Sequence, residues 1–376
     1  MGRRARKRRG RLLTPIIVLF VLGAIFAAVY FVVSLPVLLK GTGGVFGEAR
    51  APLEVDDTPH LALGLEHMRA GRLHEAARAF ESATRLDPQN VDAYVQWTRA
   101  LALTNQPSQA VAAGEWAVRL DPRNVLALAY LAQAYDWNGE YDKAIRTALK
   151  AIEIDARSAP AYAFLAEAYA DKTEWEKALE TARKAVQLDD SSIEAHRTLG
   201  YVMEKQGRYQ EAIAEYERAI ELGPNLGYLY LYLGSVHRGQ RLDDEAIAAF
   251  RKAIELQPEE PRGYHSLGLV YYNQKNYAQA IDMFERALLA APLYSPPTEY
   301  LGWSYYVQKE YEKALGYFQR AAEMTPGNAT RQAALGWTLY NLQRYPEARA
   351  AFQKAVQLDP TLALAKDGLA ATEGKE

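Results

Sequence analysis

A strict 34-residue period constrains the fold of this chain more than any other feature. Alanine recurs with this period in two columns seven residues apart, which begin at Ala76 and Ala83 and end at Ala348 and Ala355. No insertion breaks the register over nine copies. A fixed period of this length is typical of stacked supersecondary units and excludes a fold with one compact core. A proline column follows the same period, at Pro88, Pro122, Pro224, Pro258, Pro292, Pro326 and Pro360.

Each copy predicts a pair of α-helices. We number the residues of a copy so that the proline column is position 32, and apolar or small residues then fall at positions 4, 7, 8 and 11, which is one face of a helix. Polar turn residues follow, and a second run at helical spacing ends at the proline, which cannot donate a helical hydrogen bond. Position 8 is glycine in six copies, although glycine inside a helix costs roughly 1 kcal/mol against alanine. We therefore expect close helix packing there.

The pattern L-G-x-x-Y…A-x-x-x-F-x-x-A…P resembles the tetratricopeptide repeat. The resemblance implies an all-α fold, an α-solenoid of nine helical hairpins over residues 57–362, with residues 363–376 as a C-terminal capping helix. It implies little about function, because one fold serves many unrelated partners. The nine copies are 57–90, 91–124, 125–158, 159–192, 193–226, 227–260, 261–294, 295–328 and 329–362.

The chain begins with a basic run followed by a long apolar run. Residues 12–39 contain no charged residue, and a bilayer core needs about 20 apolar residues, so we predict a transmembrane signal-anchor helix. A cleaved signal peptide is the alternative, but its apolar region is only about 7–15 residues long. Residues 1–11 would form a basic cytoplasmic tail and residues 40–56 a flexible linker.

The charge pattern predicts orientation and argues against one class of partner. Residues 1–50 hold nine basic residues and one acidic residue, which gives +8 and leaves −10 for the rest of a chain whose total is −2. Basic residues collect on the cytoplasmic side of a span, so we expect a cell membrane protein with one span, its N-terminus in the cytoplasm and its repeats outside. The acidic repeats argue against nucleic acid as a partner, since phosphate binding relies on a basic surface.

No pattern in the sequence indicates catalysis. The chain has no cysteine, which excludes thiol catalysis and cysteine zinc sites. Three histidines, His60, His67 and His74, are seven residues apart, but a turn separates the last from the others, so they do not share a helix face. We expect no enzyme activity, no metal and no cofactor.

The side of the first helices opposite the core stripe is unusually aromatic. Positions 2, 5, 9 and 12 lie there, and the resemblance implies that this side lines a concave groove. Exposed aromatic area marks binding sites, whereas the alternative is that the rings pack between adjacent repeats. The predicted partner-binding residues at these and adjoining positions are Trp137, Arg197, Tyr201, Tyr228, Arg238, Arg262, Tyr272, Glu299, Trp303, Tyr306, Trp337 and Tyr340.

These features predict a membrane-anchored scaffold for protein–protein interaction. The groove would bind a protein or peptide segment, in the assembly of an envelope complex, and the membrane would be engaged through residues 12–39. The alternative is an extracytoplasmic glycan-binding protein of polysaccharide export or envelope biogenesis, because aromatic rings beside polar groups also suit sugars. The sequence does not distinguish these two ligands.

Overall fold

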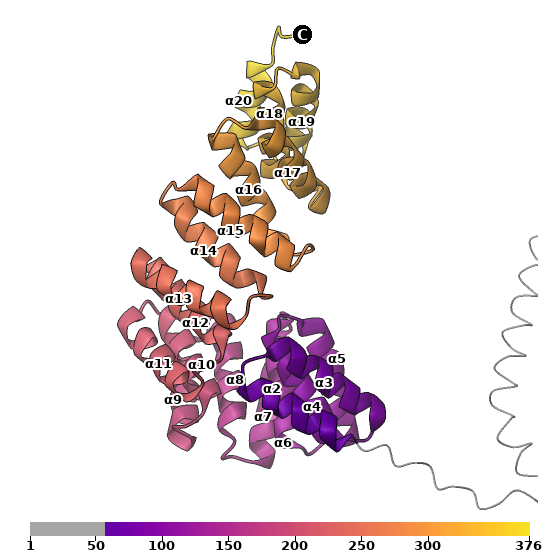
Figure 1. Cartoon of the computed structure of the whole chain (residues 1–376), viewed down its shortest axis with the longest axis vertical. Coiled ribbons are helices and arrows are strands. Elements are labelled where there is room, and N and C mark those ends of the chain that lie inside the picture. The colour runs from indigo at the N-terminus through magenta and orange to yellow at the C-terminus, as the bar shows by residue number, and fades with distance from the viewer. Residues whose placement is uncertain (1–56) are drawn as a thin grey trace, which may run out of the picture. The chain divides into compact units, whose positions relative to one another are not determined.

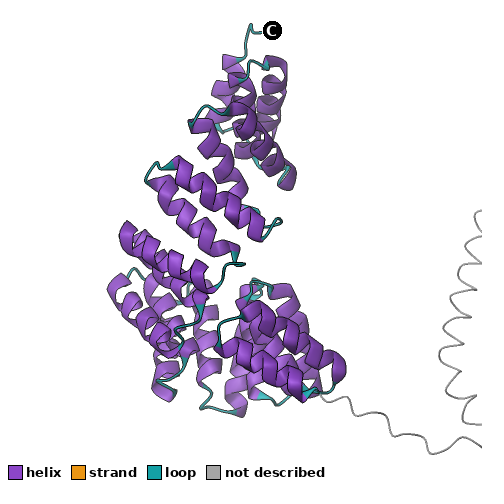
Figure 2. Cartoon of the chain, viewed as in Figure 1, coloured by secondary structure: helices purple, strands orange, loops and turns teal. Residues whose placement is uncertain are grey.

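The computed structural model describes residues 57–376, and within that range the chain is entirely helical (Figures 1 and 2). This confirms the prediction of an all-α solenoid. The predicted tail, membrane span and linker (1–56) lie outside the described residues. No helix between residues 57 and 376 is long and apolar enough to cross a membrane.

Nineteen helices follow one another along the described part of the chain, and successive helices pair into hairpins, α2 with α3 through α18 with α19. Their bounds are α2 (Thr58–Arg69), α3 (Leu73–Leu86), α4 (Val91–Leu103), α5 (Pro107–Leu120), α6 (Val125–Trp137), α7 (Tyr141–Ile154), α8 (Ala159–Asp171), α9 (Trp175–Leu188), α10 (Ile193–Lys205), α11 (Tyr209–Leu222), α12 (Gly227–Gly239), α13 (Asp243–Leu256), α14 (Pro261–Asn273), α15 (Tyr277–Ala290), α16 (Pro296–Val307), α17 (Tyr311–Met324), α18 (Ala329–Asn341), α19 (Tyr345–Leu358) and α20 (Ala363–Ala371).

Local sequence signals explain where these helices begin and turn. The side-chain oxygens of Asn124 and Ser158 accept a hydrogen bond from the backbone amide three residues later, which caps α6 and α8. Position 15 of every copy adopts a left-handed backbone conformation, and this residue lets the chain reverse between the two helices. The nine residues are Gly71, Asn105, Gly139, Thr173, Gly207, Arg241, Lys275, Lys309 and Gln343.

The glycine at position 8 packs against the aromatic ring at position 24 of the same hairpin. A Cβ atom on Gly268 would come within 2.6 Å of the Phe284 ring, and one on Gly336 would come equally close to Phe352. These phenylalanines are fully buried. The structure thus gives the steric reason for glycine in the middle of these helices.

Repeats one to six (residues 57–260) form what we call the closed turn. In this part α4, α6, α8 and α10 pack directly on one another in series. The curvature brings the beginning of the repeat domain back beside its middle (Figure 1), where α2 and α4 meet the connection between α11 and α12 and the start of α12. Met68, Leu103, Leu226 and Tyr228 are buried together in this contact, which we call the closure seam.

Repeats seven to nine with α20 (residues 261–376) form what we call the open arm. Here α14, α16 and α18 make few direct contacts with one another, and each hairpin stacks mainly through its second helix onto the next hairpin. Figure 1 shows α15 to α20 running away from the closed turn. Helix α20 packs on α18 and α19 and covers the last hairpin.

Candidate functional site

Two ion pairs lie between the inner helices of the closed turn. The Arg197 guanidinium donates two hydrogen bonds to the Glu167 carboxylate, at 2.9 and 2.5 Å, and both side chains are almost fully buried. The indole nitrogen of Trp137 donates to the same carboxylate at 3.0 Å. A second pair, Arg99 with Glu194 at 2.6 Å, bridges α4 and α10. Desolvated charges of this kind require such partners, so this network holds the inner helices together.

One carboxyl group in this interior has no partner. Asp136 is 2% exposed, and neither of its carboxyl oxygens forms a hydrogen bond with any residue between 57 and 376. Burial, with the negative charges of Glu167 and Asp171 nearby, raises the pKa of Asp136 to about 9. Asp136 is therefore protonated and neutral at pH 7, which lets it share the interior with the two other carboxylates.

Four of the predicted site residues lie inside this closed turn. Arg197 and Tyr228 are buried, and Trp137 and Tyr201 are half-buried. The Tyr201 hydroxyl donates to Asp171, so it too is engaged within the fold. The inner helices of the closed turn therefore use their aromatic and charged side chains for packing on one another, which is the alternative that the sequence left open.

The open arm places six predicted residues on the same side of its first helices. All six are half-buried, and we call them the arm surface: Tyr272, Glu299, Trp303, Tyr306, Trp337 and Tyr340. The Trp303 ring lies 5.0 Å from Phe318, and the Trp337 ring lies 5.4 Å from Phe352, edge-on in both repeats. Each indole thus rests on the core of its own hairpin and keeps part of its surface exposed.

Polar contacts join the arm surface from one repeat to the next. The Tyr306 hydroxyl accepts a hydrogen bond from the Asn341 amide at 2.9 Å, and Arg331 pairs with Glu299 at 2.9 Å. At the end of the arm, the Trp337 indole donates to the Leu364 carbonyl of α20 at 3.0 Å, and Lys375 donates to the Tyr340 hydroxyl. The arm surface is therefore a preorganised row whose last member is partly covered by α20.

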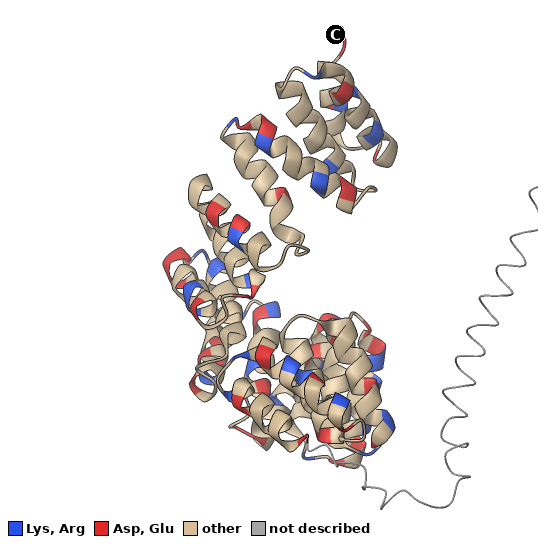
Figure 3. Ribbon diagram, turned by 45° about the vertical axis from the view of Figure 1, so that its right-hand side comes forward, with Lys and Arg blue, Asp and Glu red and all other residues tan. Residues whose placement is uncertain are grey.

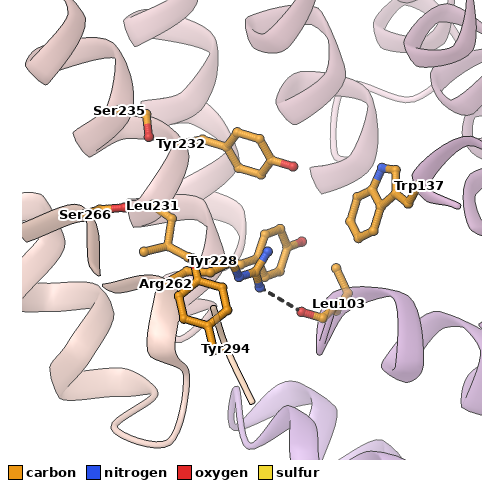
Figure 4. Close-up of a pocket in the computed structure, with 9 residues that line it drawn as sticks. All are labelled: Leu103, Trp137, Tyr228, Leu231, Tyr232, Ser235, Arg262, Ser266 and Tyr294. Carbon is orange, nitrogen blue, oxygen red and sulfur yellow. Dashed lines mark hydrogen bonds between the residues drawn. The ribbon is translucent and has the colours of Figure 1, made fainter. Parts of the chain in front are cut away.

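A cavity of about 250 Å³, which we call the seam pocket, lies where the closed turn meets the open arm. Figure 4 shows Leu103 and Trp137 on one side of it, facing residues of α12 and α14. Arg262 donates to the Leu103 carbonyl at 3.3 Å across this gap. The full lining is Leu103, Trp137, Tyr228, Leu231, Tyr232, Ser235, Arg262, Ser266 and Tyr294.

Three predicted residues meet in the seam pocket, although about ninety residues separate the first from the second and no sequence pattern predicted that they would meet. These are Trp137, Tyr228 and Arg262. The remaining predicted residue, Arg238, is half-buried and has no ion-pair partner in the described part of the chain. Sequence reasoning missed Tyr294, whose only signal is the proline-rich junction of the seventh and eighth copies, PLYSPP, where other junctions are more regular.

Acidic and basic residues are interspersed over the described helices (Figure 3). Among residues 57–376, no group of three or more histidine, aspartate and glutamate side chains is arranged to hold a metal ion. His265 is instead packed among the rings of Phe284, Tyr294 and Tyr300, and burial lowers its pKa to about 4 with help from the charge of Arg238.

Comparison with known proteins places the fold. A tetratricopeptide repeat family profile matches residues 61–96, 96–163, 197–261, 231–296, 265–329 and 301–363, which together exceed half of the chain. A profile of anaphase-promoting complex, cyclosome, subunit 3, matches residues 138–219. No curated protein matches the sequence.

A solved structure described as "Crystal structure of APC/C hetero-tetramer Cut9-Hcn1" is similar, with a TM-score of 0.63 and 18% sequence identity. The match covers 80% of this chain and 59% of that one, so this chain spans less than two thirds of its solved neighbour. Such low identity shows the shared fold alone. With the profile matches, the chain belongs to the tetratricopeptide repeat family.

Proposed function

We propose that this protein is a membrane-anchored scaffold whose arm surface binds a segment of a partner protein. One observation carries the proposal: none of the arm surface residues is fully buried, whereas the same side of the closed turn buries Arg197 and Tyr228 and engages Trp137 and Tyr201 in hydrogen bonds to the carboxylates of Glu167 and Asp171. Rigid, partly exposed tryptophan and tyrosine rings are the residues that dominate protein interfaces. The similar fold of a chain in the solved hetero-tetramer supports assembly with another protein as a use of this architecture.

The test is a double substitution, Trp303→Ala with Trp337→Ala. Screening the repeat domain (residues 55–376, one compact unit) against peptide and glycan arrays identifies a ligand. We expect a peptide, and we expect the double variant to bind it about 2–4 kcal/mol more weakly. Because each indole also packs on a core phenylalanine, the affinity must be measured on the folded fraction, with the melting temperature recorded beside it.

A matched control is Trp116→Ala, which removes an exposed indole from α5 in the closed turn. This control should leave peptide binding unchanged. Equal affinity of the wild type and the double variant in their folded fractions would overturn the proposed role of the arm surface. If ligands are found only on the glycan array, the proposed ligand is a polysaccharide rather than a peptide.

Membrane anchoring and orientation form the second part of the proposal, and the charge asymmetry around residues 12–39 supports it. We propose that the repeats lie outside the cytoplasm, where they would help to assemble an envelope complex. A reporter enzyme that is active only outside the cytoplasm, fused after Glu376, should be active. A fully expressed but inactive fusion would place the repeats in the cytoplasm instead.

A further inference from the structure

We propose that the seam pocket binds one aromatic side chain of the partner segment, and that this side chain carries a polar group, as tyrosine and tryptophan do. The inference rests on the proposed function, because it names a second point of contact for the same partner. The cavity of about 250 Å³ is smaller than the roughly 300–1,000 Å³ of sites for drug-sized ligands and cofactors. A single large side chain matches this size better than a cofactor does.

The chemistry of the lining selects an amphipathic ring. Trp137 and Tyr294 contribute aromatic surface from the two sides of the cavity. The hydroxyls of Tyr228, Ser235 and Ser266 form no hydrogen bond elsewhere in the described part of the chain and remain available to a ligand. Apolar walls with a few polar groups suit tyrosine and tryptophan, which join a large ring to one hydrogen-bonding group.

Charge argues against an acidic or basic occupant. Arg262 is held by Glu260 through two hydrogen bonds, at 2.8 and 3.0 Å, and Glu260 is itself buried. The guanidinium also donates to the Leu103 carbonyl, so its positive charge and its donors are largely used within the fold. A partner carboxylate would have to compete with Glu260, and a partner ammonium would be repelled by the guanidinium. A neutral ring avoids both costs.

The pocket exists only while the closure seam is shut, because its walls come from both sides of that seam. Away from the pocket, Gly71 touches the opposite side of the seam: its carbonyl accepts a hydrogen bond from Gln257 at 3.4 Å. A Cβ atom on Gly71 would come within 1.9 Å of the Asn225 carbonyl oxygen. Occupancy of the pocket should therefore be coupled to closure, since a ligand favours the state that forms its site.

This close approach supplies a seam-opening variant that leaves every lining residue intact. Gly71→Ala should wedge the seam apart, while Gly139→Ala is its matched control. Both glycines occupy position 15 with positive φ (+74° and +81°), but Gly139 has no atom within 4 Å of the added Cβ. Hydrogen exchange in residues 57–90 reports on the seam, and it should rise only in Gly71→Ala.

The probes are N-acetyl-tyrosine amide and N-acetyl-tryptophan amide, with N-acetyl-leucine amide for comparison, titrated by ligand-observed NMR into residues 55–376. We expect the two aromatic amides to bind more tightly than the leucine amide. If Gly71→Ala leaves one molecule in ten closed, aromatic binding should fall about tenfold, with no change in Gly139→Ala. Ser266→Leu, which fills the pocket without touching Gly71, should abolish binding and leave exchange in residues 57–90 as in the wild type.

Two results would overturn the inference. One is equal binding of the leucine and aromatic amides, and the other is aromatic binding that survives both Gly71→Ala and Ser266→Leu. The Trp303→Ala and Trp337→Ala double variant should bind the amide probes normally, since neither residue lines the pocket. A partner peptide that depends on Trp303 and Trp337 but not on Ser266 would refute the pocket and leave the proposed function standing.

Discussion

The closed turn and the open arm are made from copies of one 34-residue pattern, yet the closed turn fully buries two of the predicted site residues, Arg197 and Tyr228, whereas all six residues of the arm surface stay half-buried. Side-chain volume at position 24 differs between them. Three successive copies of the closed turn have small residues there, Gly114, Ala148 and Ala182, whereas each copy of the open arm has phenylalanine, Phe284, Phe318 and Phe352. Helix axes approach more closely where the contacting side chains are small. We therefore expect the three small residues at position 24 to contribute to the curvature of the closed turn, and with it to the accessibility of the inner side.

The largest difference between the two regions should appear in the unfolding free energy that is lost when one ion-paired carboxylate is removed from each of them. Glu167→Ala leaves Arg197 buried without its partner, which should cost about 3–5 kcal/mol of unfolding free energy. Glu299→Ala in the arm removes a pair whose side chains are 25% and 29% exposed, and should cost no more than about 1 kcal/mol. Urea titration of residues 55–376 measures both. Similar costs would show that the interior of the closed turn is hydrated in solution.

The next largest effect should come from giving the closed turn the side chain of the arm. Ala148 is fully buried next to Ala132 and Leu165, so Ala148→Phe should overpack this interface by about 1–3 kcal/mol. It should also separate α6 from α8 and raise hydrogen exchange at the closure seam. Ala278→Phe, on an exposed position of α15 in the arm, is the control and should change neither quantity. If hydrogen exchange at the closure seam is unchanged in Ala148→Phe, side-chain volume at position 24 is not the cause of closure.

Part of this comparison was readable from the sequence. The all-α solenoid could be predicted because it rests on contacts within one or two repeats. Those contacts leave local patterns in the sequence: the 34-residue period, the alternation of helix and turn, and the small residues at positions of close packing. Closure of the turn depends on Gly71 meeting Asn225, about 150 residues later, and small angular differences accumulate over that distance. No local pattern reports such a contact.

For the candidate site too, part of the arrangement could be predicted from the sequence and part could not. Helical spacing placed Trp303 and Trp337 on one side of their helices, and the structure shows them there, half-buried. Whether they bind a partner stays a prediction. The same spacing selected Arg197, but the structure gives that residue a buried carboxylate partner from the preceding repeat. Spacing defines a helix face, whereas exposure of that face depends on how closely the next repeat packs.

Opposite pH responses should separate the two regions further. Folded Asp136 keeps its proton up to a pKa of about 9, whereas an unfolded aspartate loses it near about 3.9, so the closed turn should lose stability as pH rises between these values. Burial lowers the pKa of His265 in the arm to about 4, whereas an unfolded histidine takes up a proton below about 6.5, so the arm should lose stability as pH falls from 6.5 to 4.

Two variants show which residue causes each change of stability with pH. Asp136→Asn should be increasingly more stable than the wild type as pH rises from 4 to 9, and His265→Gln should remove the loss of stability between pH 6.5 and 4. Melting temperatures of residues 55–376 across this range measure both. A constant difference between Asp136→Asn and the wild type at all pH values would mean that Asp136 titrates normally and that the interior of the closed turn is accessible to water.

The smallest expected effect concerns the hairpin turns, which the two regions share. Thr173 in the closed turn and Lys275 in the arm both have positive φ, 62° and 60°, a conformation that costs a side-chain-bearing residue roughly 1–2 kcal/mol. Glycine relieves this strain but adds entropy to the unfolded chain, so Thr173→Gly and Lys275→Gly should each stabilise by less than about 1 kcal/mol. The gain should be larger for Thr173, because its branched Cβ is crowded in this conformation. Equal small gains in the melting temperature would show that the turn backbone behaves alike in both regions, so that what separates them is the packing of the inner helices. A large loss of melting temperature in Thr173→Gly alone would instead show that the hairpin turns of repeats one to six contribute to the curvature of that region.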